Sequence, residues 1–456
     1  MSLSQPDISA VLLGGGDSRR MGFPKEMIRV DGEPLAVKQV RKLQEIFSSV
    51  AVSSNHPGYL DYLLDCPIWE DELEDAGPLA GVLTGLRKAE TEWVFFLSCD
   101  LPALPLPVMQ RVADKAAETD ADTVAIYGDD FVCAAHHRSL ISDLEGFLDE
   151  GVRSVLKFMD GREFEKLSFP QVEDWSFRDV DGPEDLWILE RVFEEVEPLP
   201  VKTVPMQRVG REGTGTDQVV VERALAVRVN GVKIATVMSI PNAGRELATG
   251  LGSYLGLIDG ADDLKSLEVD YESGNVSLEV EADDDRVANA VQFLVTSTCG
   301  GNIYGAVLED LKEAGRGKTG KVSADHLLEC LRSLRSRSPI FERTGGTHQV
   351  AFTDGERIRY FYEDVGRHNA LDKVVGKSIL DDYSLGNGAL LCTGRISTEM
   401  VFKALRQGVP VIASKAAVTS HGLELAEKYG LTVAGFARGG RINVYNAGWR
   451  ITGGSQ

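Results

Sequence analysis

Residues 8–25 read ISAVLLGGGDSRRMGFPK, and this stretch decides the fold expected for the first half of the chain. Its first six residues form an apolar run typical of a buried strand. The run ends in the glycines Gly14 to Gly16, which let the backbone come close to a ligand. Arg19, Arg20 and Lys25 follow and would add positive charge. The stretch predicts a phosphate-binding loop after a strand, with a tight structural turn as the alternative.

The loop differs from two common phosphate-binding motifs. No Gly-Lys-Ser or Gly-Lys-Thr follows the glycines, so the Walker A motif is absent. The dinucleotide-binding fingerprint would need glycine at position 19, where the chain has arginine. The loop therefore has to be interpreted from the segments around it.

Outward from the loop, strand-like and helix-like patterns alternate. This rhythm predicts an α/β domain with a mostly parallel, Rossmann-like sheet of the nucleotidyltransferase type, covered by helices on both faces. The expected strands are Ile8–Leu13, Val50–Ser53, Trp93–Leu97 and Thr123–Ile126, and the expected helices are Leu35–Phe47, Pro78–Ala89, Leu106–Ala117 and Asp185–Val196.

A break in the pattern divides the chain after this domain. Residues 198–217 are rich in proline and glycine and show no sustained periodicity, which is typical of an interdomain linker. An ordered loop packed on one domain is the alternative. We expect domains at residues 1–197 and 218–456, in agreement with roughly 150 residues per domain for 456 residues.

The second half begins with strands and then returns to alternating strands and helices. Asn230-Gly231 lies between two apolar runs and predicts a two-residue hairpin. Residues 267–280 predict a second hairpin. From Thr347 onward, strands near residues 348–352, 389–392, 410–413 and 432–436 alternate with helices. The pattern predicts an α/β domain with an added β-rich subdomain.

Composition and charge exclude several classes of protein. Hydrophobic residues make up 43% and charged residues 26%, which is typical of a globular chain. The net charge of −22 opposes binding to nucleic acids. The N-terminus has no secretory pattern, and no apolar stretch approaches the roughly 20 residues that span a bilayer. The expected location is the cytoplasm, without membrane or nucleic-acid partners. The scattered cysteines do not suggest a disulfide scaffold or a zinc ribbon: Cys66, Cys99, Cys133, Cys299, Cys330 and Cys392.

Asp100 directly follows the expected strand Trp93–Leu97. A carboxylate at the carboxyl end of a buried strand lies where open α/β sheets bind ligands. It is also a suitable ligand for Mg²⁺ held together with substrate phosphates. A helix N-cap is the alternative role. The nearby segment Gly77–Gly81 predicts a helix start whose backbone could face a base edge.

Together with Asp71 and residues 181–186, these pieces resemble the molybdenum cofactor guanylyltransferase (MobA) family over about residues 7–195. The family usually has alanine at the position of Gly14 and asparagine near residue 181. The resemblance implies GTP as substrate, molybdopterin as acceptor and Mg²⁺ bound by Asp100, with Asp100 and Lys25 in catalysis. The implied site comprises Leu13, Gly14, Gly15, Gly16, Arg20, Lys25, Asn55, Asp71, Gly77, Pro78, Leu79 and Asp100. A cytidylyl or sugar-phosphate transferase is the alternative.

Cys299 lies in a polar, glycine-containing loop and is therefore expected to be accessible. An accessible thiol can act as a nucleophile or carry sulfur. An inert surface thiol is the alternative. Other glycine-rich turns of this half, at residues 344–348, 363–373, 393–397 and 436–441, are candidate anion sites.

The second half resembles the formate dehydrogenase accessory sulfurtransferase (FdhD) family over about residues 218–447, most specifically through Asp364-Val365-Gly366-Arg367-His368. The family fold is similar to cytidine deaminases, but the zinc signature of working deaminases is absent from this sequence. The family usually has Cys-x-x-Cys where this chain has Cys299 and Asn302. The loss of the second cysteine would remove a relay step, whereas a single cysteine suffices for a persulfide.

The resemblance implies that Cys299 takes sulfur from a cysteine desulfurase and passes it to the bis-guanylated molybdenum cofactor for formate dehydrogenase. It also implies a cofactor-binding segment made of Phe436, Ala437, Arg438, Gly439, Gly440 and Arg441, and it leaves a homodimer open. The combined hypothesis is a bifunctional cofactor-maturation enzyme. The alternative for the second half is a cofactor chaperone without chemistry.

Overall fold

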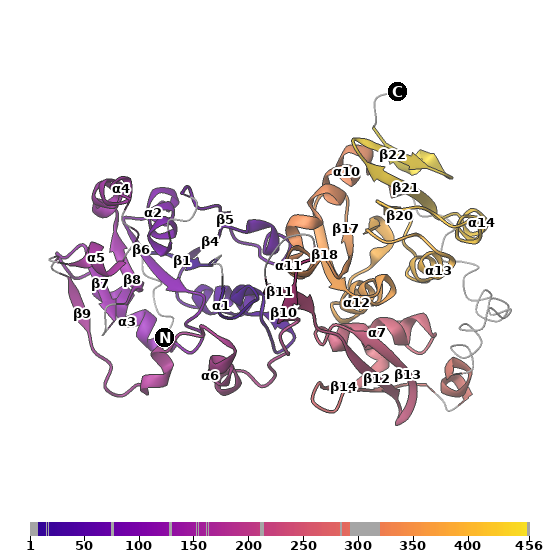
Figure 1. Cartoon of the computed structure of the whole chain (residues 1–456), viewed down its shortest axis with the longest axis horizontal. Helices are drawn as coiled ribbons and strands as arrows, with labels where there is room; N and C mark the ends of the chain where they lie inside the picture. The colour runs from indigo at the N-terminus through magenta and orange to yellow at the C-terminus, as the bar shows by residue number, and fades with distance from the viewer. Residues whose placement is uncertain are drawn as a thin grey trace. The chain divides into compact units, whose positions relative to one another are not determined.

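The structure is a computed structural model, and its described residues form two compact units, Met1–Glu197 and Pro198–Gln456. Figure 1 colours the chain from the N-terminus to the C-terminus. The described residues are 8–14, 16, 18–73, 77–126, 130–151, 153, 155–160, 162, 164–209, 214–282, 285–291 and 320–453.

The first unit is built on a seven-stranded sheet with the order β5-β4-β1-β6-β8-β7-β9. All neighbouring strands are parallel except β8, which is antiparallel to β6 and β7. The chain runs from β1 outward to β4 and β5 and then returns to β6 on the other side of β1. In open α/β sheets such a switch point marks the ligand site, at the carboxyl ends of the strands. The strands are β1 Ser9–Leu13, β4 Ser49–Ser53, β5 Ile68–Trp69, β6 Trp93–Ser98, β7 Thr123–Ile126, β8 Asp130–His137 and β9 Glu165–Leu167, beside a short pair β2 Arg29–Val30 and β3 Glu33–Pro34.

Helices cover both faces of this sheet, with α2 and α4 on one face and α1 and α3 on the other (Figure 1). The α2 helix packs so closely on β6 that a Cβ atom added at Gly85 would lie 2.5 Å from the ring of Phe96. The core of this face contains Val11, Leu86 and Phe96, which are fully buried. The helices are α1 Leu35–Gln44, α2 Pro78–Lys88, α3 Leu106–Ala116, α4 Ile141–Asp149, α5 Val155–Met159 and α6 Leu186–Val192.

The second unit contains a four-stranded sheet, β13-β12-β15-β14, and a six-stranded sheet, β18-β17-β19-β20-β21-β22. In the larger sheet β19, β20 and β21 are parallel, whereas β17, β18 and β22 pair antiparallel with their neighbours. The strands are β12 Arg223–Val229, β13 Val232–Ser239, β14 Leu264–Asp270, β15 Asn275–Val280, β17 His348–Thr353, β18 Ile358–Asp364, β19 Ala389–Cys392, β20 Val411–Ser414, β21 Thr432–Arg438 and β22 Arg441–Val444, beside the pair β16 Val322–Ser323 and β23 Ile451–Thr452.

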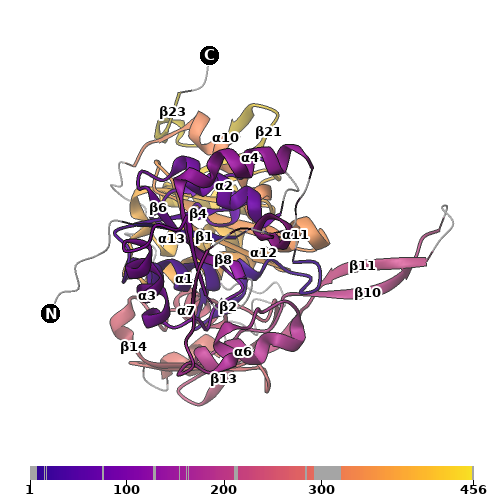
Figure 2. The ribbon, with the colours of Figure 1, turned by 90° about the vertical axis from the view of Figure 1, so that its left-hand side faces the viewer.

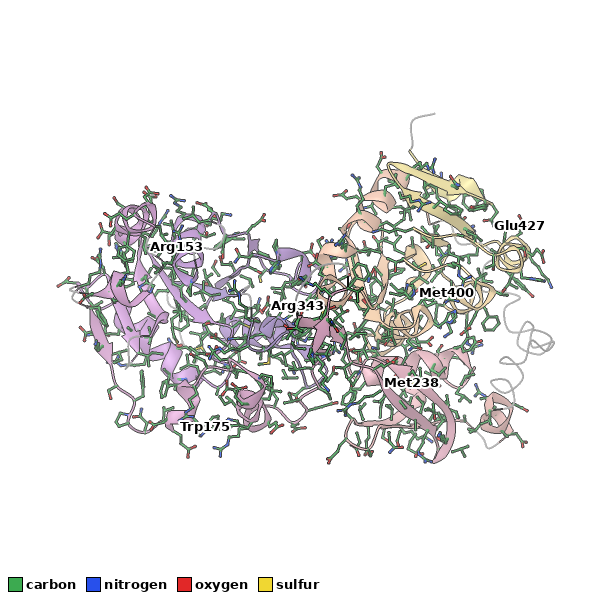
Figure 3. The ribbon with its side chains drawn as sticks, in the orientation of Figure 1. Arg153, Trp175, Met238, Arg343, Met400 and Glu427 are labelled. Atoms are coloured by element: carbon green, nitrogen blue, oxygen red, sulfur yellow. The ribbon has the colours of Figure 1, made fainter. Side chains whose placement is uncertain are left out.

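Both units confirm the α/β class expected from the sequence, and the four-stranded sheet is the β-rich addition. In the hairpin between β12 and β13, Asn230 and Gly231 have φ angles of 48° and 77°, as a tight two-residue turn requires. Met400 lies in the interior of the second unit, while Glu427 lies at its edge (Figure 3). The helices are α7 Gly244–Tyr254, α10 Ala324–Ser333, α11 Pro339–Thr344, α12 Arg367–Leu380, α13 Thr398–Arg406 and α14 Ser420–Tyr429.

The expected linker differs from the structure. Its residues contribute to an antiparallel hairpin, β10 Val201–Gln207 with β11 Thr214–Val220, which projects from the second unit (Figure 2). Most side chains of both strands are exposed or half-buried. Because neither face of the hairpin is deeply buried, the sequence lacks the apolar alternation that normally predicts a strand. The segment expected to be an interdomain linker therefore contains a regular hairpin that its sequence does not predict.

Among the described residues, no helix combines the length and apolar character needed to cross a membrane. The described cysteines are all free thiols: Cys66, Cys99, Cys133, Cys330 and Cys392.

Candidate functional site

A cavity of about 310 Å³ lies in the first unit at the switch point of the sheet. The carboxyl ends of β1, β4 and β6 and the start of α2 line this cavity. Its lining consists of Leu13, Gly14, Gly16, Ser18, Arg19, Arg20, Lys25, Glu26, Ser53, Asn55, Asp71, Gly77, Pro78, Gly81, Ser98, Cys99, Asp100 and Asp181.

Backbone hydrogen bonds continue the sheet into the loops that form this cavity. The amide of Gly14 donates to the carbonyl of Ser53 at 2.8 Å, and the amide of Cys99 donates to the carbonyl of Leu13 at 2.9 Å. A Cβ atom added at Gly81 would lie 2.9 Å from the side chain of Leu13. The absence of a side chain at this position lets α2 approach the strand end.

Lys25 forms the charged centre of the cavity. Its Nζ lies 3.0 Å from Oδ2 of Asp100 and 2.7 Å from Oδ1 of Asp181. Arg20 pairs with the same Asp181, and the Ser98 hydroxyl donates to Asp100. Two carboxylates and two cations therefore converge within one cavity, on loops that follow different elements of the fold.

These contacts shift the pKa values of the groups involved. Burial would lower the pKa of Lys25, but the charge of Asp100 and the hydrogen bonds to both carboxylates raise it above its usual value. Burial would raise the pKa of Asp181, but Lys25 and Arg20 hold it below its usual value. Both groups are therefore charged at neutral pH.

Asp71 also lines the cavity and accepts a hydrogen bond from the Ser53 hydroxyl. Burial raises the pKa of Asp71, and this hydrogen bond only partly offsets the increase. A half-buried carboxyl group near the start of α2 can accept hydrogen bonds from a ligand's N–H groups.

The structure brings most of the predicted first-half residues together. Among the expected site residues, ten line the cavity: Leu13, Gly14, Gly16, Arg20, Lys25, Asn55, Asp71, Gly77, Pro78 and Asp100. Leu79 is fully buried in the hydrophobic cluster between α2 and the sheet, because its position in the first turn of α2 turns its side chain into the core. Gly15 lies outside the described residues.

Asp181 lines the cavity but was not among the expected site residues, although residues 181–186 contributed to the resemblance. It follows no strand, and its neighbour in sequence, Gly182, begins a short turn. Asp185 stabilises this turn, because its carboxylate accepts hydrogen bonds of 3.0 Å from the backbone amides of Asp181 and Gly182. Ser53 and Ser98 were also not selected, although each ends a strand beside the glycine loop. The strand-end positions of the two serines were a usable signal, whereas Asp181 follows no strand and its only signal was the motif at residues 181–186.

The residues around Lys25 fit a divalent cation. Asp100 and Asp181 direct carboxylate oxygens at one ammonium group, so the space between them already holds positive charge. Mg²⁺ prefers oxygen ligands and is usually held by one or two carboxylates together with substrate phosphates. No cluster of three or more metal-ligating side chains occurs among the described residues, so phosphate oxygens would have to complete the coordination.

In the second unit, Cys299 and the neighbouring Asn302 lie outside the described residues. The predicted cofactor-binding segment, Phe436–Arg441, comprises the end of β21, the turn at Gly439 and Gly440, and the first residue of β22. Phe436, Gly439 and Gly440 have positive φ angles of 51°, 62° and 76°. Arg438 is exposed, and its guanidinium carbon lies 5.7 Å from the ring centroid of Phe436. The segment thus presents arginine side chains and an aromatic ring on a sharply turned backbone.

Within the specific segment at residues 364–368, Asp364 is internal, whereas the four residues after it are half-buried. Asp364 and Lys373 are fully buried and form an ion pair of 2.7 Å. Asp364 also accepts hydrogen bonds from Ser239, the amide of Gly366 and Asn369. These groups connect β18, the start of α12 and the end of β13. They are therefore bonded to one another inside the unit.

Comparisons with known proteins match both halves. Residues 220–452 match the FdhD/NarQ family, and residues 10–165 match the MobA-like NTP transferase domain. The sulfur carrier protein FdhD of Bacillus pumilus is 33% identical over 256 residues, which cover 55% of this chain and 97% of that protein. The same-named protein of Methanothermobacter thermautotrophicus is 34% identical over 242 residues, covering 52% and 92%.

A solved structure, molybdopterin-guanine dinucleotide biosynthesis protein A from Archaeoglobus fulgidus, is 18% identical with a TM-score of 0.36, covering 41% of this chain and 98% of that one. The match over residues 220–452 extends over half of the chain, and the relatives are covered almost completely. The chain belongs to the FdhD/NarQ family and carries a MobA-like NTP transferase domain ahead of the family's segment.

Proposed function

We propose that the first unit transfers GMP from GTP to the terminal phosphate of molybdopterin and releases pyrophosphate. The observation that carries this proposal is the cavity at the switch point of the sheet, where Lys25, Arg20, Asp100 and Asp181 converge. The match to the MobA-like NTP transferase domain supports nucleotidyl transfer. The choice of guanine and of molybdopterin rests on the family resemblance.

The side chains of the cavity suit attack by one phosphate on another. Lys25 and Arg20 would bind the triphosphate and stabilise charge that develops on the leaving pyrophosphate. Asn55 and Asp71 would hold the nucleoside. The acceptor phosphate is itself the nucleophile, so catalysis needs alignment and charge neutralisation rather than a protein nucleophile.

Asp100 and Asp181 are the residues that would hold Mg²⁺. Bound there, the ion would neutralise phosphate oxygens and fix their geometry. Lys25 Nζ now lies between the two carboxylates, so we expect it to move to a phosphate oxygen when the substrate and its metal bind. This exchange would keep the charge of the cavity balanced.

A nucleotide panel tests the proposal for the first unit. The full chain is incubated with molybdopterin and GTP, CTP or ATP, and released pyrophosphate is measured. We expect release with GTP and Mg²⁺, and its loss in Asp100→Asn. Faster release with CTP, or with a sugar phosphate as acceptor, would replace guanylyl transfer with the corresponding reaction. Unchanged release in Asp100→Asn would remove Asp100 from the site.

For the second unit we propose that Cys299 carries sulfur as a persulfide from a cysteine desulfurase to the guanylated molybdenum cofactor for formate dehydrogenase. The family relationship and the relatives named as sulfur carriers support this role. The Phe436–Arg441 segment would bind the guanine nucleotide parts of the cofactor. Mass spectrometry of Cys299 after incubation with a desulfurase provides the test. An added sulfur supports carriage, and an unmodified thiol with cofactor still bound supports a chaperone.

A further inference from the structure

Two turns of the second unit that the proposed function does not use bring a serine and a histidine together. The turn at residues 393–397 leads from β19 into α13, and Ser397 directly precedes that helix. His368 is the second residue of α12, and its Nε2 lies 3.3 Å from the hydroxyl oxygen of Ser397. Ser397 is half-buried and the His368 side chain is 28% exposed, so a reagent in solution can reach the pair.

The Ser397 hydroxyl does not cap its own helix. A serine directly before a helix normally accepts a hydrogen bond from an amide of the first turn. Ser397 makes no such side-chain bond, and its hydroxyl pairs with His368 instead. The usual structural role of a serine at this position therefore does not account for this contact.

A carboxylate contacts the histidine on its other nitrogen. Oε2 of Glu399 lies 3.6 Å from Nδ1 of His368, and Oε1 of Glu399 lies 3.3 Å from Nζ of Lys403. Lys403 is buried and also pairs with the buried Asp372 at 2.7 Å. Glu399 is thus held between a fixed cation and the imidazole ring. A carboxylate at Nδ1 favours the tautomer with its proton on Nδ1, so the lone pair of Nε2 faces the serine hydroxyl.

The ionisation of these groups suits proton transfer from the serine. Burial lowers the pKa of His368, although the charge of Glu399 acts in the opposite direction. Burial would raise the pKa of Glu399, but the charge of Lys403 holds it below its usual value. At physiological pH, His368 is therefore neutral and able to accept a proton, and Glu399 is ionised.

Arg367 adds a cation beside the same turn. A Cβ atom added at Gly394 would lie 2.7 Å from Cδ of Arg367, so the arginine packs on the turn that ends at Ser397. The Nε of Arg367 is buried and has no hydrogen-bond partner within the described part of the chain. A buried donor without a partner costs free energy that a bound acceptor would recover. Arg367 is thus suited to stabilise negative charge that develops on a substrate oxygen.

We propose that Ser397, His368 and Glu399 form a nucleophilic triad that hydrolyses a carboxylic ester or thioester. The arrangement combines a nucleophile within reach of a base with a third group that orients the base. Arg367 stabilises the oxyanion of the tetrahedral intermediate. The activity goes beyond the proposed function, because it requires no nucleotide, no molybdopterin and no sulfur donor.

The reaction balances with water as the second substrate. The oxygen of Ser397 bonds to the acyl carbon while its proton passes to Nε2 of His368. The bond from that carbon to the alcohol or thiol then breaks, and the leaving group takes the proton. Water attacks the acyl-serine and gives a proton to His368. This proton returns to Ser397 as the carboxylic acid leaves.

A fluorophosphonate probe tests for an activated serine. The probe is incubated with the full chain, its phosphorus bonds to the serine oxygen as fluoride leaves, and mass spectrometry locates the label. We expect the label on Ser397. His368→Gln should slow labelling at least about a hundredfold, because the general base is lost. Glu399→Gln should slow it at least about tenfold, because the tautomer of His368 is no longer fixed. Hydrolysis of p-nitrophenyl acetate should fall in the same order.

Ser420 and His421 provide matched controls, because this exposed serine–histidine pair begins α14 of the same unit. Ser420→Ala and His421→Gln should leave the position and rate of labelling unchanged. Glu399→Gln changes a side chain that is 36% exposed, so it tests the triad even if His368→Gln does not fold. The proposal would be overturned by an unlabelled Ser397 in the original chain, by equal labelling of Ser420, or by an unchanged rate in Glu399→Gln or in folded His368→Gln.

Discussion

At the scale of single residues, Lys25 is the cation that pairs with both carboxylates of the first-unit cavity. It is the group through which Asp100 and Asp181, far apart in sequence, are held close together. Without its charge the two carboxylates would repel each other, and the triphosphate would lose a cation. Both effects act against substrate binding and against stabilisation of the leaving group.

We therefore predict that Lys25→Gln lowers pyrophosphate release from GTP and molybdopterin roughly a hundredfold, as expected when one preorganised charge is removed. The measurement is the initial rate at saturating Mg²⁺. Lys38→Gln is the control, because Lys38 lies at 3.6 Å and 3.7 Å from Asp31 and Glu33, outside the cavity. Equal rates in the two variants would argue against a role for Lys25.

The buried pair of Asp364 and Lys373 gives a second prediction. Lys373→Met would leave the Asp364 carboxylate buried without its cation, so we expect a loss of about 3–5 kcal/mol in the free energy of unfolding. Lys377→Met, on the same helix, removes a partly exposed ion pair with Asp381 and should change stability by about 0.5 kcal/mol or less. Urea denaturation measures both variants, and a similar loss in both would contradict the internal role of Asp364.

Glu363 gives a prediction on pH. It is buried, and it accepts hydrogen bonds from the amides of Ile340 and Phe341 and from Thr347. Burial raises its pKa from 4.5 to about 7, with these hydrogen bonds acting in the opposite direction. The folded state therefore binds more protons than the unfolded state, so this contribution to stability is present below pH 4.5 and is lost as the pH rises through about 7.

The variant Glu363→Gln should lack this dependence. Between pH 4.5 and 7, the free energy of unfolding of the original chain should fall by roughly 3 kcal/mol more than that of the variant. Denaturation curves across the window measure the difference. Parallel curves for the two proteins would mean that Glu363 does not titrate in this range.

At the scale of elements, the contact between α7 and α12 joins the two sheets of the second unit. Glycines allow the backbones to meet: a Cβ atom at Gly376 would lie 1.8 Å from the carbonyl of Glu246, and one at Gly250 would lie 2.0 Å from that of Asp372. No flexible side chain can move aside there, because the atoms approached belong to the backbone. The position of one sheet relative to the other therefore depends on these small residues.

We predict that Gly376→Ala destabilises the second unit by about 1–3 kcal/mol or more, through overpacking against Glu246. Gly146→Ala is the matched control, because a Cβ atom there meets nothing within 4 Å and alanine favours the helix. It should be neutral or stabilising by up to about 1 kcal/mol. Thermal unfolding compares the two, and a neutral Gly376→Ala would show that the helices can separate without loss.

Elements also show how far the sequence was informative. Apolar periodicity predicts β1, β6, α2 and most of the second unit, because each of these elements buries one face or both. The same reasoning locates the glycine loop and Asp100, since both follow strongly apolar strands. It fails for the β10–β11 hairpin, whose exposed faces leave no pattern, and for Asp181, whose position depends on a tertiary contact with Lys25.

At the scale of the whole molecule, one chain combines a MobA-like NTP transferase domain with an FdhD/NarQ family segment. In the proposed account the product of the first unit is the ligand of the second. Covalent linkage raises the effective concentration of the second site, up to millimolar values for short flexible connections. This advantage exists only if the second unit binds the guanylated cofactor.

Retention of newly made cofactor tests this account most directly. The full chain is supplied with molybdopterin and GTP labelled in its α-phosphate, and protein-bound label is measured after rapid gel filtration. We predict that label is retained as guanylated cofactor, and that Arg438→Gln with Arg441→Gln releases it while pyrophosphate release continues. The account would be contradicted if labelled cofactor were formed but left both proteins equally, or if no label entered the cofactor at all.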